Sequence, residues 1–179
     1  AKPGGADEWR ELARRIARGA TAIFLSPEVF VKGEQLLGWL PLANKGTPTA
    51  IVSYLYIKDE WVKRHPIFEG LPSGGLMDYS CYRDLIPDIV WSGQEPPAEA
   101  VAGAINASLG YSSGLLVAVY NLGAGRFFLN TLLIRECLSH HPAAERLLRN
   151  MLRYAAHDVE KPPAVLPHGF DEQLNAMGY

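Results

Sequence analysis

The apolar residues of this chain follow a helical spacing in some segments and a strand-like spacing in others. From Asp7 to Arg18 they form one stripe, with acidic residues in the first turn and arginine in the last, which suits an amphipathic helix and its dipole. Thr21 to Leu25 is a short apolar run bounded by Gly19 and by Ser26-Pro27, and it predicts a buried strand. A helix that leads into a strand is typical of α/β proteins.

The middle of the chain predicts strands separated by turns and loops. A weaker helical pattern covers Gly33 to Leu42, and Thr49 to Ile57 has the β-branched and aromatic residues of a strand. His65 to Gly75 is rich in proline and glycine and predicts a structured loop whose apolar residues reach the core. Asp88 to Trp91 predicts a further short strand. Ala98 to Ala107 fits a helix through its alanines or a strand through its alternation, and both readings stay open.

The last third of the chain combines two apolar runs with helical segments. Gly114 to Asn121 and Gly125 to Leu132 are joined by Leu122-Gly123-Ala124, which predicts an antiparallel hairpin near the end of the sheet. Helical periodicity follows and, after an interruption at Pro142, covers Ala143 to Ala156 with a continuous apolar stripe.

Length and charge restrict the classes of function. The 179 residues suit one domain, over residues 1–158, followed by an extended arm over residues 159–179. The 17 Lys plus Arg nearly balance the 19 Asp plus Glu, so the net charge of -2 gives no global attraction to nucleic acid or acidic membranes. No apolar run approaches the roughly 20 residues that a membrane-spanning helix needs. We therefore expect neither nucleic acid nor membrane as a partner.

The two cysteines are the candidate nucleophiles. Cys137 lies close in sequence to His140 and His141, a grouping that a thiol–imidazole pair or a metal site could use. A structural zinc site needs four ligands, however, and Cys137 falls on the apolar side of a helix. Cys81 has polar neighbours, but neither cysteine has the flanking glycines of a nucleophile elbow. Catalysis by Cys81, Cys137 or His140 is thus an alternative to ordinary packing, and no metal is expected.

Carbohydrate chemistry has a different set of candidates. Glycoside hydrolysis needs two carboxylates facing each other across a sugar, and the acidic residues are too scattered for the sequence to identify a pair. Trp39, Trp61 and Tyr79 lie in or near predicted loops, where their rings could contact a sugar or a partner, although aromatic side chains more often pack in cores. The Gly123 to Arg126 step lacks the third glycine and the following helix of a dinucleotide site, so no cofactor is expected.

Taken in order, four segments resemble the class I glutamine amidotransferase-like module in the C-terminal part of some bacterial glycoside hydrolases, especially those of the family 2 and β-galactosidase kind. The likeness runs from about Thr21 to Ala156. Its segments are Ala22 to Ser26 after a helix, His65 to Pro72, Gly114 to Thr131 with its Gly123 to Arg126 turn, and Pro142 to Ala155.

The resemblance implies a three-layer, flavodoxin-like α/β fold and a structural role beside a catalytic barrel. True amidotransferases carry a Cys, His and Glu triad, and because the elbow is missing here no triad residue is carried over. Such a fold begins with a strand, whereas this chain begins with a helix, so the first strand is expected to be missing or supplied by preceding sequence. We therefore expect a non-catalytic accessory module of a glycoside hydrolase that contacts the preceding catalytic domain, forms homo-oligomers or binds carbohydrate. The alternatives are a small thiol-dependent hydrolase or amidotransferase-like enzyme and a sugar-binding module.

Overall fold

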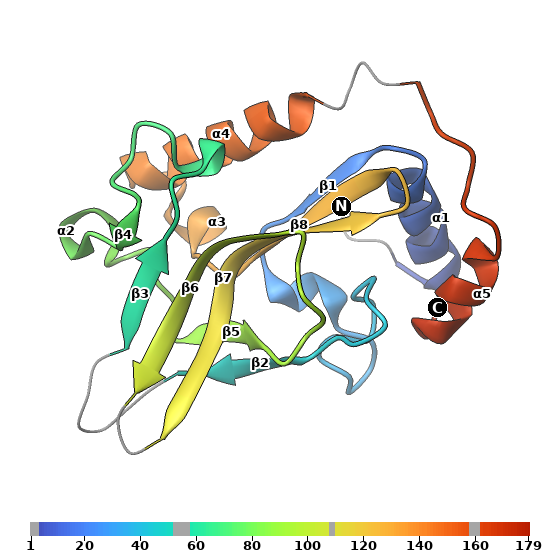
Figure 1. Cartoon of the computed structure of the whole chain (residues 1–179), viewed down its shortest axis with the longest axis horizontal. Helices are drawn as coiled ribbons and strands as arrows, with labels where there is room; N and C mark the ends of the chain where they lie inside the picture. The colour runs from blue at the N-terminus through green and yellow to red at the C-terminus, as the bar shows by residue number, and fades with distance from the viewer. Residues whose placement is uncertain (1–3, 52–57, 108–109, 158–161) are drawn as a thin grey trace.

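The computed structural model describes residues 4–51, 58–107, 110–157 and 162–179, and it shows a mixed α/β fold (Figure 1). The strands are β1 (Thr21–Phe24), β2 (Thr47–Ala50), β3 (Asp59–Val62), β4 (Gly75–Leu76), β5 (Ile89–Ser92), β6 (Glu99–Ala107), β7 (Tyr111–Leu122) and β8 (Gly125–Asn130). The helices are α1 (Ala6–Ala17), α2 (Tyr79–Tyr82), α3 (Ile134–Cys137), α4 (Pro142–Ala156) and α5 (Phe170–Ala176), with the 3-10 turns η1 (Pro27–Phe30) and η2 (Pro66–Phe68). Across these ranges no helix is both long enough and apolar enough to cross a lipid bilayer.

The strands form one mixed sheet in which β6 and β7 are the longest. Its main path runs β1-β8-β7-β6-β3-β4, and β5 joins β2 to β7. β1 runs parallel to β8, whereas the other described pairs are antiparallel. Between β7 and β8 the chain reverses so tightly that Leu122 pairs with Gly125, and Gly123 takes a φ of 59° there. A glycine adopts this left-handed conformation without the steric cost of a side chain.

A hydrophobic core lies on each face of the sheet. One core joins the sheet to α3, α4 and η2, with Phe68, Phe128 and Leu147 among its buried residues. The other joins the sheet to α1, η1 and α5, and it includes Trp9 and Phe127. The fold therefore has three layers, with α4 over one face of the sheet and α1 and α5 over the other, as Figure 1 shows.

Several elements are confirmed where the sequence pattern was strongest. α1 begins and ends within one residue of the predicted helix, and it buries Trp9 and Ile16. β1 occupies four of the five predicted positions, and α4 begins at Pro142, the residue that favours a first helical turn. In the loop from residue 65 to 75, Ile67 and Phe68 are buried as expected.

The predicted helix from Gly33 to Leu42 is wrong. Gly33 takes a left-handed φ of 57°, and Lys32 and Gln35 exchange two backbone hydrogen bonds that close a tight turn. The chain then folds back, since the Trp39 amide donates to the Phe30 carbonyl oxygen. Leu37, Leu40 and Leu42 are still buried. The apolar spacing therefore identified residues of the core correctly. The glycines and Pro41, however, favour turns over a helix, and these turns bring the leucines into the core.

Three other segments differ from their outline in the sequence. The range 98–107, open between helix and strand, contains β6, which is paired on both sides. The strand predicted over 49–57 is described only to residue 51, and β2 begins earlier, at Thr47; residues 52–57 lie outside the described residues. In the segment expected to be an extended arm, residues 170–176 form α5, and Phe170 is buried.

Candidate functional site

One row of residues crosses five strands on the sheet face that bears α1. The register places Leu76, Trp61, Gly103, Leu115 and Trp91 side by side on β4, β3, β6, β7 and β5. Directly opposed residues share a face of a sheet. Leu76 is 68% exposed at the edge, whereas Trp91 is 1% exposed because η1 covers it, with the Phe30 ring 6.1 Å away. The second core thus covers one end of the row and leaves the other end open.

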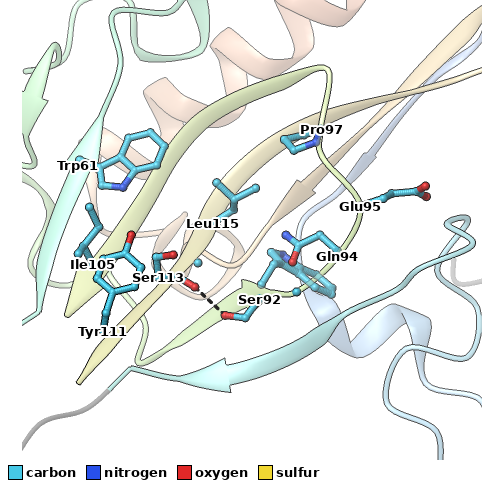
Figure 2. Close-up of a pocket in the computed structure, with 12 residues that line it drawn as sticks. Trp61, Ser92, Gln94, Glu95, Pro97, Ile105, Tyr111, Ser113 and Leu115 are labelled. Atoms are coloured by element: carbon cyan, nitrogen blue, oxygen red, sulfur yellow. Dashed lines mark hydrogen bonds between the residues drawn. The ribbon is translucent and has the colours of Figure 1, made fainter. Parts of the chain in front are cut away.

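A hollow of about 320 Å³ lies over the open part of this row. Figure 2 shows Trp61, Ile105 and Tyr111 along one side of the hollow, with Ser92 and Gln94 along the other and Leu115 between them. Tyr111 is 73% exposed. The hollow therefore combines flat apolar surface with hydroxyl and amide groups.

Two glycines shape the sheet around the hollow: Gly114 lines it, and Gly103 lies next to the Trp61 ring. A Cβ at Gly103 would lie 2.5 Å from the carbonyl oxygen of Gly114 and 2.6 Å from Cζ2 of Trp61, so the Trp61 indole lies against bare backbone. A Cβ at Gly114 would meet Val90 and, at 2.6 Å, the Trp91 carbonyl oxygen, so this glycine lets β5 approach β7. Glycine in a strand often marks such a close approach. The position of the Trp61 ring is therefore built into the sheet.

The loop from Gly93 to Pro97 forms one wall of the hollow, and hydrogen bonds hold it. Asn44 donates its side-chain amide to the Gly93 carbonyl oxygen at 3.0 Å, and the Glu95 amide donates to the Asn44 carbonyl oxygen at 3.2 Å. The Ala43 amide donates to Oε1 of Glu95 at 3.2 Å, and the Tyr120 hydroxyl donates to the Glu95 carbonyl oxygen at 3.0 Å. Burial raises the pKa of Tyr120 to about 12, so the hydroxyl stays protonated and able to donate. The wall is thus ordered before any ligand arrives.

The three aromatic residues singled out in the sequence have different surroundings. Trp61 lines the hollow. Trp39 stacks between Trp9 and Tyr179, with ring centroids 6.0 and 5.9 Å away, and it packs, partly buried, against the second core. Tyr79, at the start of α2, is 66% exposed and does not line the hollow.

The candidate thiols and imidazole are not brought together. Sγ of Cys137 contacts the Asp84 carbonyl oxygen at 3.3 Å, and burial raises the pKa of this thiol. Burial also raises the pKa of Cys81, and the carboxylate of Asp78 adds to the shift. Nδ1 of His140 lies 3.3 Å from the Ser139 hydroxyl. Neither cysteine is in a disulfide, and both thiols are held in the protonated form at neutral pH.

A separate polar network lies on the opposite face of the sheet, beneath α4. Nδ1 of His65 accepts from the Ile67 amide, so Nε2 donates to Oε2 of Glu99, at 2.7 Å. The Tyr154 hydroxyl donates to the same carboxylate at 2.8 Å, and Nη1 of Arg126 lies 3.8 Å from it. Burial raises the pKa of Glu99, but the hydrogen bonds from His65 and Tyr154 outweigh burial and hold the pKa below its ordinary value. The network joins β6, β8, α4 and the loop before η2.

The low pKa of Glu99 predicts a stability that depends on pH. Because the folded pKa lies below the unfolded value near 4.5, the network stabilises the fold above that pH, and this contribution is lost as the pH falls through the folded pKa. We expect Glu99→Gln to lower the free energy of unfolding by about 1 kcal/mol at pH 7, a modest figure because the carboxylate is partly exposed. Urea unfolding from pH 7 to pH 3 would measure the difference, which should shrink towards acid; a constant difference would contradict it. Glu145→Gln, in an exposed pair with Arg149, is the control.

Sequence reasoning missed most of the residues around the hollow. Tyr111, Ser113 and Leu115 alternate along β7, and this period of two was the available signal that they share a face. Ser92 and Gln94 gave no comparable signal, because their place depends on the pairing of β5 with β7.

The comparisons do not assign the chain to a family. Within the described ranges no three His, Cys, Asp or Glu side chains gather as metal ligands would. No protein-family model matches the chain, and a search of curated proteins finds no significant relative.

Proposed function

We propose that this chain is a non-catalytic accessory module of a carbohydrate-active hydrolase, and that the hollow beside Trp61 binds neutral carbohydrate. The observation that carries the proposal is the Trp61 indole, which packs against the backbone at Gly103 and lines the hollow together with hydroxyl and amide groups. Aromatic rings offer a rigid apolar face, which suits the C–H face of a pyranose. The Ser92 hydroxyl donates to the Ser113 carbonyl oxygen at 3.0 Å and can still accept, as Figure 2 shows, whereas the Ser113 hydroxyl and the Gln94 amide can both donate and accept, as sugar hydroxyls require.

Charge supports a neutral ligand. Among the described residues that line the hollow, Glu95 alone has a charged side chain, and Nζ of Lys63 lies 5.9 Å from the centre of the Trp61 ring. These opposite charges leave no net charge that would select an acidic sugar over a neutral one.

Removal of the Trp61 ring tests the binding site. Trp61→Ala should weaken binding of the tightest neutral oligosaccharide by about 30-fold or more, which corresponds to the loss of a central aromatic contact. Isothermal titration calorimetry with neutral oligosaccharides of glucose, galactose, mannose and xylose would measure it, after circular dichroism has shown that the variant is folded.

The matched control is Leu152→Ala, which removes an exposed side chain from α4 on the opposite face of the sheet. This control should bind as the unaltered chain does. Equal affinities for Trp61→Ala and the unaltered chain would contradict the site, and a chain that prefers uronic-acid oligosaccharides would contradict the proposed neutral ligand.

The assignment to the amidotransferase-like, flavodoxin-like modules of bacterial family 2 glycoside hydrolases belongs to the same proposal. Helices on both faces of the sheet support it. The sheet itself departs from a flavodoxin-like one, which is mainly parallel, because β1–β8 is the one parallel pair among the described strands. A groove of about 690 Å³ between α1, β1 and α4, beside the 56% exposed Leu152, offers a surface for the preceding catalytic domain. Co-purification with that domain, abolished by Leu152→Asp, would support this contact; unchanged co-purification would contradict it, and a molar-mass measurement would test self-association.

A thiol-dependent enzyme is the second candidate function, and the reactivity of the two cysteine thiols distinguishes it from the accessory module. With both thiol pKa values raised above 9.0, alkylation by iodoacetamide should be slow at pH 7 and should accelerate up to and beyond pH 9. Mass spectrometry would follow each cysteine separately. A rate that is already maximal near pH 7 at Cys81 or Cys137 would favour the enzyme.

A further inference from the structure

A second hollow, of about 360 Å³, lies against the same wall as the first. Both hollows are lined by Glu95 and Pro97, so the loop from Gly93 to Pro97 separates them. The Glu95 side chain points away from Trp61 in Figure 2. The wall therefore presents one surface to each hollow.

The second hollow has a lining that suits another part of the same kind of ligand. Pro96 and Pro97 provide apolar ring surface, and Asn121 and Gln173 provide exposed amides that can donate and accept. Among the described residues of this lining, Glu95 is again the one with a charged side chain. The chemistry of the first hollow, apolar rings with neutral hydrogen-bonding groups, is repeated here.

The spacing along β7 sets the length of ligand that could reach both hollows. Leu115 lines the first hollow and Tyr120 lines the second. Five residues of a strand span about 17 Å. This separation is longer than one pyranose ring, so a monosaccharide in the first hollow would not reach the amides of the second.

We propose that a neutral oligosaccharide crosses the Gly93–Pro97 loop and occupies both hollows at once. The four hydrogen bonds that hold this loop support the inference, because an ordered wall costs little conformational entropy when it binds. The inference rests on the proposed carbohydrate site and extends it from a single sugar to a chain.

The test combines ligand length with a variant in each hollow. Calorimetry with neutral sugars of the best-bound type, from the monosaccharide to the hexasaccharide, should show an affinity that rises with the number of sugar units and then levels off. Gln173→Ala should weaken binding of the hexasaccharide about fivefold, which corresponds to the loss of one neutral hydrogen bond, and should leave the affinity for the monosaccharide unchanged. Trp61→Ala should weaken every length. Gln173 is exposed on α5, so its replacement is compatible with folding.

The outcomes separate the two proposals. If no sugar of any length binds, the proposed function itself fails. Sugar binding that requires Trp61, with an affinity that does not change with ligand length or with replacement of Gln173 or Asn121, would support the carbohydrate site. The same result would overturn the inference that one ligand occupies both hollows. A length dependence that disappears in Gln173→Ala or Asn121→Ala supports the inference.

Discussion

Gly125→Ala is expected to destabilise the fold by about 3 kcal/mol or more, because overpacking against backbone is costly where nothing can give way. A Cβ at this position would overlap the carbonyl oxygens of Ile16 and Ala20 and would lie 3.0 Å from the carbonyl carbon of Gly19. Relief would require β8 to move away from the end of α1, and β8 is paired with β1 and β7. Chemical denaturation would measure the loss.

Gly75→Ala is the matched control, since a Cβ at Gly75 in β4 meets no atom within 4 Å. Its effect should be within about 0.5 kcal/mol of zero, or slightly stabilising through the unfolded chain. Similar midpoints for the two variants would show that the contact between α1 and β8 is looser than described.

Trp9→Ala is expected to lower the free energy of unfolding by about 3–5 kcal/mol, as large-to-small changes of aromatic core residues do. Trp9 is 1% exposed, and its ring lies 5.9 to 6.1 Å from those of Phe24, Phe30 and Trp39. Its removal would leave a cavity between α1, β1 and η1. Differential scanning fluorimetry and urea titration would both report the change.

Tyr79→Ala provides the comparison, because it removes an aromatic ring of which 66% is exposed. We expect a change of about 0.5 kcal/mol or less for this variant. Trp9→Phe should lose less stability than Trp9→Ala, since phenylalanine keeps an aromatic ring in the core and leaves a smaller cavity. An equal loss for Trp9→Ala and Tyr79→Ala would contradict the described core.

The sequence predicted those helices and strands that short-range patterns of residues determine. The stripe of α1 and the proline that starts α4 depend on neighbours within a few turns of helix. The helix predicted over residues 33–42 was wrong for the same reason, because that prediction used only the local apolar spacing. The apolar residues are buried, but the left-handed Gly33 and the hydrogen bond from the Trp39 amide to the Phe30 carbonyl oxygen determine the path of the backbone.

The candidate site could be predicted only in part, because it depends on strand register. Trp61 was identified by its residue type, yet its place beside Leu115 follows from β6 lying between β3 and β7. The network around Glu99 likewise joins His65 to Tyr154, which are far apart in the chain. Local periodicity carries no information on such pairings.

The pairing of α1 with α5 affects how neighbouring domains could be attached. Arg14 contacts Asp171 at 2.7 Å, and Arg10 contacts Asn175, so the first and last described helices lie side by side. Figure 1 places both helices away from the ends of β6 and β7 that border the hollow. A polypeptide joined before α1 or after α5 would therefore leave from the same pole of the molecule. Either fusion would leave the hollow beside Trp61 facing outward.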